Sequence, residues 1–314
     1  MESSRCTTIE DLNKLVISGE LRPLIRYEEA MHEMQFCRIA EDVCQKGAVV
    51  VMLSGPSSSG KTTSANRLAT QLRVHGKEPV LMSLDDYYID RDKIAPGPDG
   101  KLDLEHINTI DTELFARNMQ DVLAGALVEI PTFNFKTGKR EWNGHFLRLE
   151  KESVIIVEGL HALNPVLLPK ELDPGMVFRM YVCPQLSLKL DDENRIPSSY
   201  LRLLRRIVRD YESRGTSVQR TVAMWDSVRQ GEKRWIFPFQ EQADEMVNTA
   251  LLFELATLRD QALPVLEEVP ENTPEYTEAY RLRKFLSYFK SISLEGLPPT
   301  SLLREFLGGS TFKY

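Results

Sequence analysis

Several features that mark other classes of protein are missing from this sequence. Cysteines are few and have no CxxC spacing, which argues against a zinc site or a disulfide framework; they are Cys6, Cys37, Cys44 and Cys183. The longest apolar runs, such as Val49 to Leu53, fall far short of the ~20 residues that a membrane span needs. Residues 1–6 contain no basic stretch followed by an apolar one, so they indicate neither secretion nor lipid anchoring. We therefore expect a cytoplasmic protein with reduced thiols and no membrane span.

An excess of positive charge is also missing. The 314 residues carry a net charge of −7, and a chain of that charge repels nucleic acid at long range. We therefore do not expect a nucleic-acid partner. Any site that binds an anion must be created locally, by a few residues brought together.

Composition and hydrophobic pattern together predict that the chain is divided into three structural parts. With 42% hydrophobic residues, the chain can bury a sizeable core. Apolar residues in 28–44 have the spacing of an amphipathic helix, which predicts an N-terminal helical extension over residues 1–46. Prolines gather after Pro264, which predicts a C-terminal helical appendage over 263–314, suited to packing or to forming a homo-oligomer. Residues 47–262 are then the main domain.

Short β-branched and aliphatic runs alternate with helical patterns along this domain. The runs are typical of strands buried on both faces of a parallel sheet; they are Val49–Leu53, Val80–Leu84, Val154–Val157 and Val177–Val182. Helical patterns cover residues 65–72 and 113–123. The segments 128–135 and 140–149 flank a turn that contains Gly138, which predicts a β-hairpin. The predicted fold is α/β, with a doubly wound, mainly parallel sheet and one hairpin.

The turn after the first predicted strand satisfies the GxxxxGK[ST] pattern of a P-loop. Small residues there let backbone N–H groups approach phosphates, while Lys61 reaches the β and γ oxygens and Thr62 offers a hydroxyl to Mg²⁺. The alternative, a chance Ser/Gly turn, does not explain why a buried strand precedes the turn and a helix follows it. We therefore predict an ATP site formed by Gly55, Pro56, Ser57, Ser58, Ser59, Gly60, Lys61, Thr62 and Thr63.

Acidic side chains follow two other predicted strands. Asp85 comes after the second run and Glu158 after the third. The carboxyl ends of parallel strands meet at one edge of a sheet, which places both acids beside the phosphates. We predict that Thr62, Glu158 and Asp85 hold Mg²⁺ and that Asp85 also acts as the general base toward an acceptor hydroxyl. The alternative, a loop carboxylate or a helix cap, suits Asp86 better than Asp85.

Residues 200–215 combine an apolar helical face with a cationic stripe. The stripe consists of Arg202, Arg205, Arg206 and Arg209. The arginine fork binds phosphate oxygens bidentately, so such a helix can close over ATP and neutralise charge during transfer. We therefore expect a lid at about residues 186–235. Two alternatives remain open, a solvated amphipathic helix and a basic patch for RNA.

The chain resembles the phosphoribulokinase and uridine kinase family. Five blocks occur in that family's order: GPSSSGKTT, SLDDYY, IPTFNFKTGKRE, VIIVEGLHAL and RLLRRIVRDYESRG. The resemblance implies a P-loop NTPase core, a mobile arginine-bearing lid, ATP with Mg²⁺, and phosphorylation of a hydroxyl on a small molecule. It implies catalytic roles for Asp85, Lys61, Arg205 and Arg209. It adds Arg202, Arg206 and Arg214 to the ATP site and places the acceptor near Tyr88, His106, Asn108, Phe133 and Arg140.

The acceptor pocket departs from the family pattern. Uridine-cytidine kinases lead us to expect Asp at Asn108, Tyr at Phe133 and His at Gly138. Losing the tyrosine and histidine removes polar groups through which a pocket rejects the wrong base. The leading expectation is phosphorylation of the 5′-hydroxyl of uridine, cytidine or a related nucleoside. The alternatives are a kinase of a sugar phosphate, pantothenate-like compound or polyol, a nucleotide-binding regulator associated with RNA, and a degenerate kinase acting as a scaffold.

Overall fold

The structure of the chain is a computed structural model that describes residues 6–94, 103–191 and 193–313. Residues 1–5 of the predicted N-terminal extension and Asp192 of the predicted lid lie outside the described residues. Within the described part, none of the helices is both long and apolar enough to cross a membrane. The four cysteines are free thiols.

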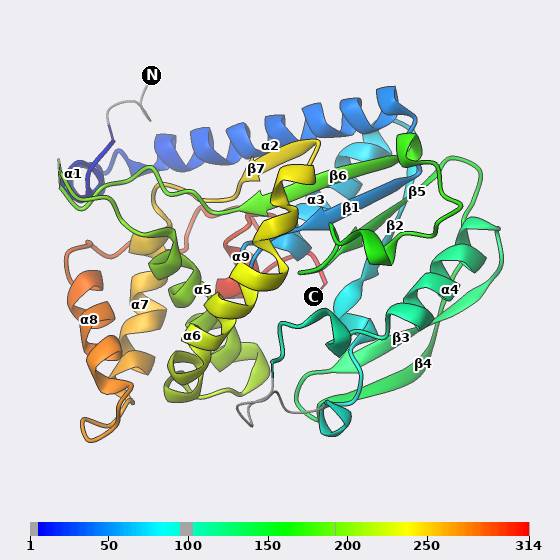
Figure 1. Ribbon diagram of the computed structural model, residues 1–314. Helices are drawn as coiled ribbons and strands as arrows, with labels where there is room; N and C mark the ends of the chain where they lie inside the picture. The colour runs from blue at the N-terminus through cyan, green and yellow to red at the C-terminus, as the bar shows by residue number, and fades with distance from the viewer. Residues whose placement is uncertain (1–5, 95–102, 192, 314) are drawn as a thin grey trace.

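Five parallel strands form the central sheet, in the order β2-β5-β1-β6-β7 (Figure 1). They are β1 (Val50–Ser54), β2 (Glu78–Ser83), β5 (Ser153–Glu158), β6 (Val177–Cys183) and β7 (Glu245–Asn248). The first four match the predicted runs, and every residue of β1 is buried. β7 escapes prediction because it is a four-residue edge strand in which only Val247 is buried. The prediction of a doubly wound parallel sheet is confirmed.

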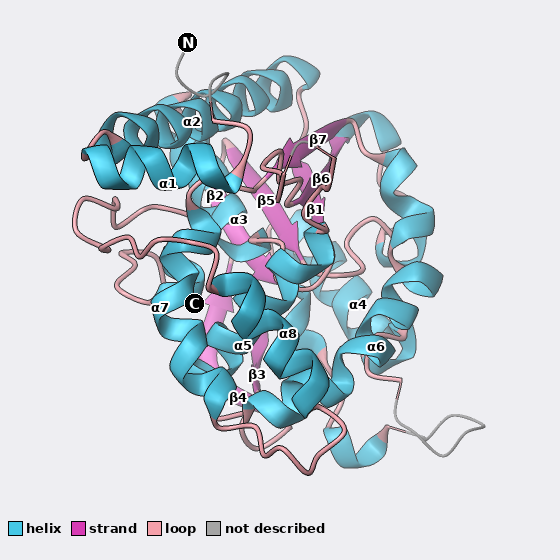
Figure 2. Ribbon diagram, turned by 90° about the vertical axis from the view of Figure 1, so that its left-hand side faces the viewer, coloured by secondary structure: helices cyan, strands magenta, loops and turns pink. Residues whose placement is uncertain are grey.

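Helices cover both faces of this sheet (Figure 2). On one face, α2 (Leu21–Lys46) and α3 (Lys61–Val74) pack through residues such as Leu68. On the other face, α4 (Thr112–Leu123) buries Phe115. Burying each of these large apolar side chains contributes about 1.5–3 kcal/mol. The two layers enclose the sheet whose carboxyl edge carries the phosphate site.

The helix α2 is longer than its sequence pattern indicates. It extends over 26 residues, whereas the pattern predicts a helix over 28–44. Ile39 and Val43 are buried against the sheet as expected, but Met31 and Met34 are 42% and 39% exposed. Their exposure is a correction to the predicted apolar face, since only the last turns of α2 lie over the sheet.

The β-hairpin forms around Gly138, as the sequence pattern predicts. β3 (Val128–Asn134) and β4 (Lys139–Leu147) pair antiparallel as a separate two-stranded sheet. Gly138 has φ 70°, a left-handed conformation that glycine adopts without strain. β3 packs beside the one-turn 3₁₀ helix Leu84–Tyr87 that follows β2, so the hairpin flanks the carboxyl edge of the main sheet.

Six helices share a third hydrophobic core with the first turns of α2, which contribute Leu21, Leu24 and Ile25, in the described part of the chain. They are α1 (Ile9–Ser18), α5 (Ser198–Arg214), α6 (Val218–Trp235), α7 (Glu254–Glu267), α8 (Tyr276–Leu286) and α9 (Arg304–Leu307). This core corrects the predicted division into three parts, since the boundary at 262/263 falls inside α7. The apolar face of the predicted lid helix, with Leu204 and Ile207, is fully buried here. That face needs partners, and the two chain ends supply them.

Candidate phosphate-binding site

The P-loop runs between β1 and α3 in a conformation that only particular residues allow. Gly60 has φ 85° at the N-cap of α3. A Cβ atom on Gly55 would stand 2.2 Å from the carbonyl oxygen of Val182, so the loop can pass β6 only as glycine. The Lys61 ammonium donates to the carbonyl oxygen of Pro56 at 3.2 Å. The loop is therefore closed on itself, with the lysine folded over it.

A buried ion pair between α5 and α6 anchors the backbone of the P-loop at Ser57. Arg202 donates to both carboxylate oxygens of Glu232, at 2.6 and 2.9 Å, and to the carbonyl oxygen of Ser57 at 3.1 Å. Glu232 in turn accepts from the backbone N–H of Ser57 at 2.8 Å. Its side chain is fully buried, and that of Arg202 is 7% exposed. Arg202 is expected to bind ATP, but in the structure its guanidinium instead binds the backbone of the P-loop at Ser57.

The structure also moves Arg205 out of the predicted catalytic group. Its guanidinium is fully buried and donates to both carboxylate oxygens of Glu254, to the carbonyl oxygen of Thr249 at 2.8 Å and to that of Ser58 at 3.3 Å. A guanidinium engaged in this way has no face left for a transferring phosphoryl group. The correction has a simple cause, because this side of α5 faces α7 instead of the nucleotide.

Three other arginines of α5 cluster around a single carboxylate. Arg206, Arg209 and Arg214 gather around Asp210, at 3.3, 2.7 and 3.7 Å. Burial raises the pKa of Asp210, but the three guanidinium groups outweigh that effect and hold the pKa below its ordinary value. Arg206 also donates to the hydroxyl of Ser57 at 2.8 Å. Arg206 and Arg209 of the predicted stripe thus share one carboxylate with Arg214, and Arg206 also contacts the P-loop.

Glu158 lies at the end of β5 among hydroxyl groups. Its carboxylate accepts from the hydroxyl of Ser83 at 2.9 Å and from that of Thr62 at 3.4 Å. Burial, together with the charge of Asp85, raises the pKa of Glu158 to about 7. A buried carboxylate beside hydroxyl oxygens is the type of donor set that Mg²⁺ takes, so these residues fit that ion.

A second buried carboxylate stands near Asp85, and the sequence did not single it out. Glu105 is 8% exposed, and its Oε2 has no hydrogen-bond partner. Burial raises its pKa to about 7, with Glu232 and Asp85 adding to the effect against Arg206 and Lys61. The stretch around His106 is flagged by resemblance, but nothing local distinguishes Glu105 from a surface glutamate. Only the packing of α6 against it, at Gly231, shows that it is buried.

An aromatic cluster lines the hairpin side of the site. The rings of Tyr88, Phe133 and Phe135 contact one another, with centroids 5.2–6.2 Å apart. The guanidinium of Arg214 stacks over Phe135 at 4.2 Å. The predicted acceptor residues Tyr88 and Phe133 thus come together, and the end of α5 covers them.

The other three predicted acceptor residues do not join this aromatic cluster. His106 packs against Trp235, with centroids 4.3 Å apart, and its Nδ1 accepts from the backbone N–H of Asn108 at 3.0 Å. The side chain of Asn108 is exposed and does not join the buried group. Arg140, in β4 of the hairpin, pairs with Asp111 at 2.9 Å. In this stretch the buried carboxylate that feels the charge of Asp85 is that of Glu105, three residues before Asn108.

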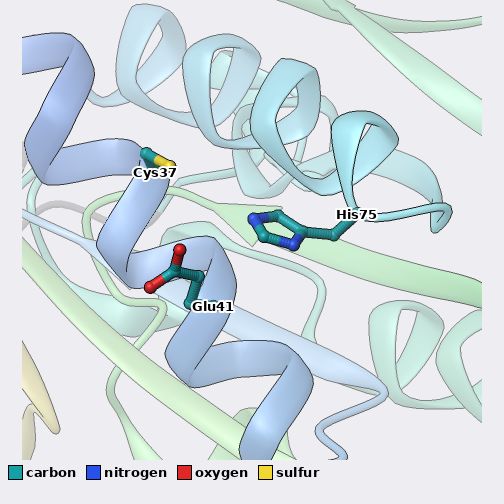
Figure 3. Close-up of side chains that lie close together, drawn as sticks. All are labelled: Cys37, Glu41 and His75. Carbon is teal, nitrogen blue, oxygen red and sulfur yellow. The ribbon is translucent and has the colours of Figure 1, made fainter.

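Two further features lie away from the phosphate site. Cys37 and Glu41, one turn apart on α2, face His75 just after α3, and their donor atoms lie within 4.8 Å of one another (Figure 3). This group sits at the opposite end of α3 from Lys61. A cleft of about 850 Å³ is lined by residues such as Lys77 and Glu152, at the amino ends of β2 and β5. Neither feature contains a residue of the predicted site.

Comparison with known proteins agrees with this geometry. A uridine kinase from Ligilactobacillus salivarius (strain UCC118) is 30% identical over 200 residues, which cover 63% of this chain and 84% of that protein. A uridine kinase from Macrococcus caseolyticus (strain JCSC5402) is 27% identical over 219 residues, 68% of this chain and 96% of that one. A solved structure of a kinase ascribed to a fructose transport system, from Silicibacter sp. TM1040, has a TM-score of 0.51 at 21% identity and covers 68% of this chain and 98% of its own, which shows a shared fold.

The sequence model described as the Phosphoribulokinase / Uridine kinase family matches residues 50–252. That region contains the P-loop, the acids at the carboxyl edge of the sheet, the hairpin and the arginines of α5. The P-loop cradle explains ATP as the phosphate donor. The chain belongs to the phosphoribulokinase / uridine kinase family and is an ATP-dependent kinase.

Proposed function

We propose that this kinase transfers the γ-phosphoryl group of ATP to the 5′-hydroxyl of a pyrimidine nucleoside, with uridine or cytidine as acceptor. The observation that carries the proposal is that Asp85 and Glu105 are electrostatic neighbours of each other and of Tyr88, whose ring contacts that of Phe133. Carboxylates suit the hydroxyls of a sugar, and aromatic faces suit a planar base. The relatives named uridine kinase support the same acceptor.

Each residue of the site then has a role in transfer. Thr62 and Glu158 would hold Mg²⁺, which when bound would supply positive charge to neutralise the phosphates. Lys61 and Arg209 stabilise the charge that spreads over the phosphate oxygens during transfer. Asp85 orients the acceptor hydroxyl and takes its proton. Glu105 binds the sugar hydroxyls, which satisfies its unpartnered oxygen.

The pocket wall is less polar than in uridine-cytidine kinases. Phe133 replaces the tyrosine expected there and offers only its ring and its backbone N–H, which donates to Asp86 at 3.2 Å. A pocket without that hydroxyl has fewer polar groups to leave unpaired when the wrong base enters. We therefore expect weak discrimination between pyrimidine bases.

A different small metabolite is the second candidate for the acceptor. Glu105 and Asp85 also suit the neighbouring hydroxyls of a sugar or polyol, because carboxylates recognise hydroxyls without reference to a base. The RNA-associated alternative loses support, because two of the four arginines of the stripe, Arg202 and Arg205, are buried in ion pairs and are not available to phosphodiesters.

The test is ADP release from ATP and Mg²⁺ across a panel of nucleosides, sugars, sugar phosphates and polyols. It compares the wild type with Asp85→Asn, which keeps the size of the side chain but not its basicity. Asp226→Asn is the matched control, since Asp226 is exposed on α6. We expect uridine or cytidine to give turnover that Asp85→Asn lowers at least about a hundredfold. Turnover with a sugar alone would select the second candidate, and turnover that is equal in Asp85→Asn would remove Asp85 as the base.

A further inference from the structure

The C-terminal segment of the chain lies directly on the P-loop. Leu302 is fully buried, and a Cβ atom on Gly60 would approach its side chain to 2.9 Å. Arg67 of α3 donates to the carbonyl oxygen of Thr300 at 3.0 Å, and Phe306 packs under the guanidinium of Arg205. Figure 1 shows this segment, in red, near the carboxyl edge of the sheet. It lies outside the residues that the family model matches.

This segment brings a carboxylate to the start of the P-loop helix. Glu305 accepts from the backbone N–H of Thr63 at 3.1 Å and from its hydroxyl at 2.7 Å. Thr63 is the third residue of α3, so its N–H belongs to the first turn, where N–H groups lack a partner within the helix. Those N–H groups are the donors that a P-loop presents to phosphates.

Glu305 is also an electrostatic neighbour of the catalytic groups. The pKa of Glu158 is raised mainly by burial and by Asp85, and the charge of Glu305 adds to this rise. Glu305 likewise contributes to the electrostatic environment of Arg209. A phosphate bound at the start of α3 therefore meets a like charge from the chain itself. Two anions close together repel, and both seek the same donor.

We propose that Glu305 is an internal competitor for the nucleotide, so that its carboxylate occupies the start of α3 when ATP is absent and must withdraw when the phosphates bind. The observed affinity for nucleotide is then lower than the intrinsic affinity, by the fraction of molecules in which the contact is released. The coupling is reciprocal, because a bound nucleotide must weaken the attachment of the C-terminal segment by the same factor. This competition between Glu305 and the nucleotide involves only the phosphate donor and does not depend on the identity of the acceptor.

Glu305→Gln separates the charge from the hydrogen bonds. The amide oxygen of glutamine still accepts from Thr63, and the side chain keeps its size, so the cap on α3 remains. Glu295→Gln is the matched control, because Glu295 is an exposed residue of the same segment. Thermal unfolding without nucleotide checks that both variants retain the fold.

The experiment measures ADP binding to the full chain with Mg²⁺ by calorimetry. We expect Glu305→Gln to bind ADP about tenfold more tightly than the wild type, and Glu295→Gln to bind as the wild type does. The difference should shrink at high salt. Equal or weaker binding by Glu305→Gln overturns the proposal and leaves Glu305 as a structural cap.

A second measurement follows the reciprocal effect. Hydrogen exchange of the amides in residues 301–309 should be faster in the wild type with saturating ADP than without it, since the released segment opens more often. Exchange that is unchanged or slower with ADP contradicts the proposal. Neither measurement uses an acceptor, so a failure here is distinguishable from a failure of the proposed nucleoside activity.

Discussion

The buried pair of Glu232 and Arg202 gives the sharpest test of how the P-loop is held. Glu232→Gln keeps the size of the side chain but removes its charge. The amide oxygen can still accept from the Ser57 N–H, but the amide nitrogen then faces a guanidinium nitrogen of Arg202, donor against donor. The variant leaves a buried guanidinium without a compensating charge.

The cost of that change can be worked out from the structure. Breaking a buried ion pair by removing one partner costs about 3–5 kcal/mol. For 314 residues, an unfolding entropy of ~2.1 cal/mol/K per residue amounts to about 0.66 kcal/mol/K. A loss of about 4 kcal/mol in the free energy of unfolding therefore lowers Tm by about 6 °C. ADP binding should weaken as well, since the backbone of Ser57 loses its anchor.

Differential scanning calorimetry of the wild type, Glu232→Gln and Glu10→Gln measures this effect. Glu10 is the control because it pairs with Lys14 at 2.8 Å in an exposed position, with the side chains 77% and 66% exposed. Its loss should change Tm by less than about 1 °C. If Glu232→Gln also stays within about 1 °C of the wild type, the reasoning is refuted, because the buried pair would then contribute no more than a surface pair.

Three further changes test other parts of the site. Gly55→Ala places a Cβ atom 2.2 Å from the carbonyl oxygen of Val182, so we expect calorimetry to detect no ADP binding, whereas Gly175→Ala, which meets only a nearby side chain at 3.3 Å, should bind normally. Lys61→Met should lower kcat at least about a hundredfold with Tm nearly unchanged, and near-normal turnover would remove the lysine from catalysis. Glu105→Gln tests pH dependence: burial raises the pKa of Glu105 from 4.5 to about 7, so the stability that this group contributes is complete below about pH 4.5 and is lost as the pH rises through 7. In Glu105→Gln the free energy of unfolding should no longer fall by this contribution, which is on the order of 3 kcal/mol between pH 4.5 and 8. A slope of Tm against pH equal to that of the wild type would contradict the effect of burial assigned to Glu105.

The contiguous parts of this molecule could be predicted from sequence. The P-loop forms from consecutive residues, since Gly60 must adopt a left-handed conformation and the flanking strand and helix are visible as patterns. The hairpin follows from two alternating segments and Gly138. Asp85 and Glu158 could be predicted because residues that end parallel strands share one edge of the sheet. For the P-loop and the hairpin the physical cause lies within a few residues of its effect, and for the two acids it lies in the parallel arrangement of the strands.

The roles of the arginines of α5 could not be predicted from the sequence pattern. Helical spacing places Arg202, Arg205, Arg206 and Arg209 on one side of a helix, but it does not say what that side faces. The structure pairs Arg202 with Glu232 on α6 and Arg205 with Glu254 on α7. Those carboxylates lie 30 and 49 residues further along the chain. Which guanidinium is buried and which meets the nucleotide therefore depends on how three helices pack.

The sequence by itself determined the fold class, the phosphate cradle and the acids at the edge of the sheet, because these follow from local backbone geometry and from strand order. Only the tertiary structure decided that Glu105 is buried with an unpartnered oxygen and that Glu305 reaches the start of α3. Neither glutamate differs locally from a surface residue. The burial and contacts of a carboxylate, and hence its pKa, are set by neighbours that come from distant parts of the chain, and that information exists only after the chain has folded.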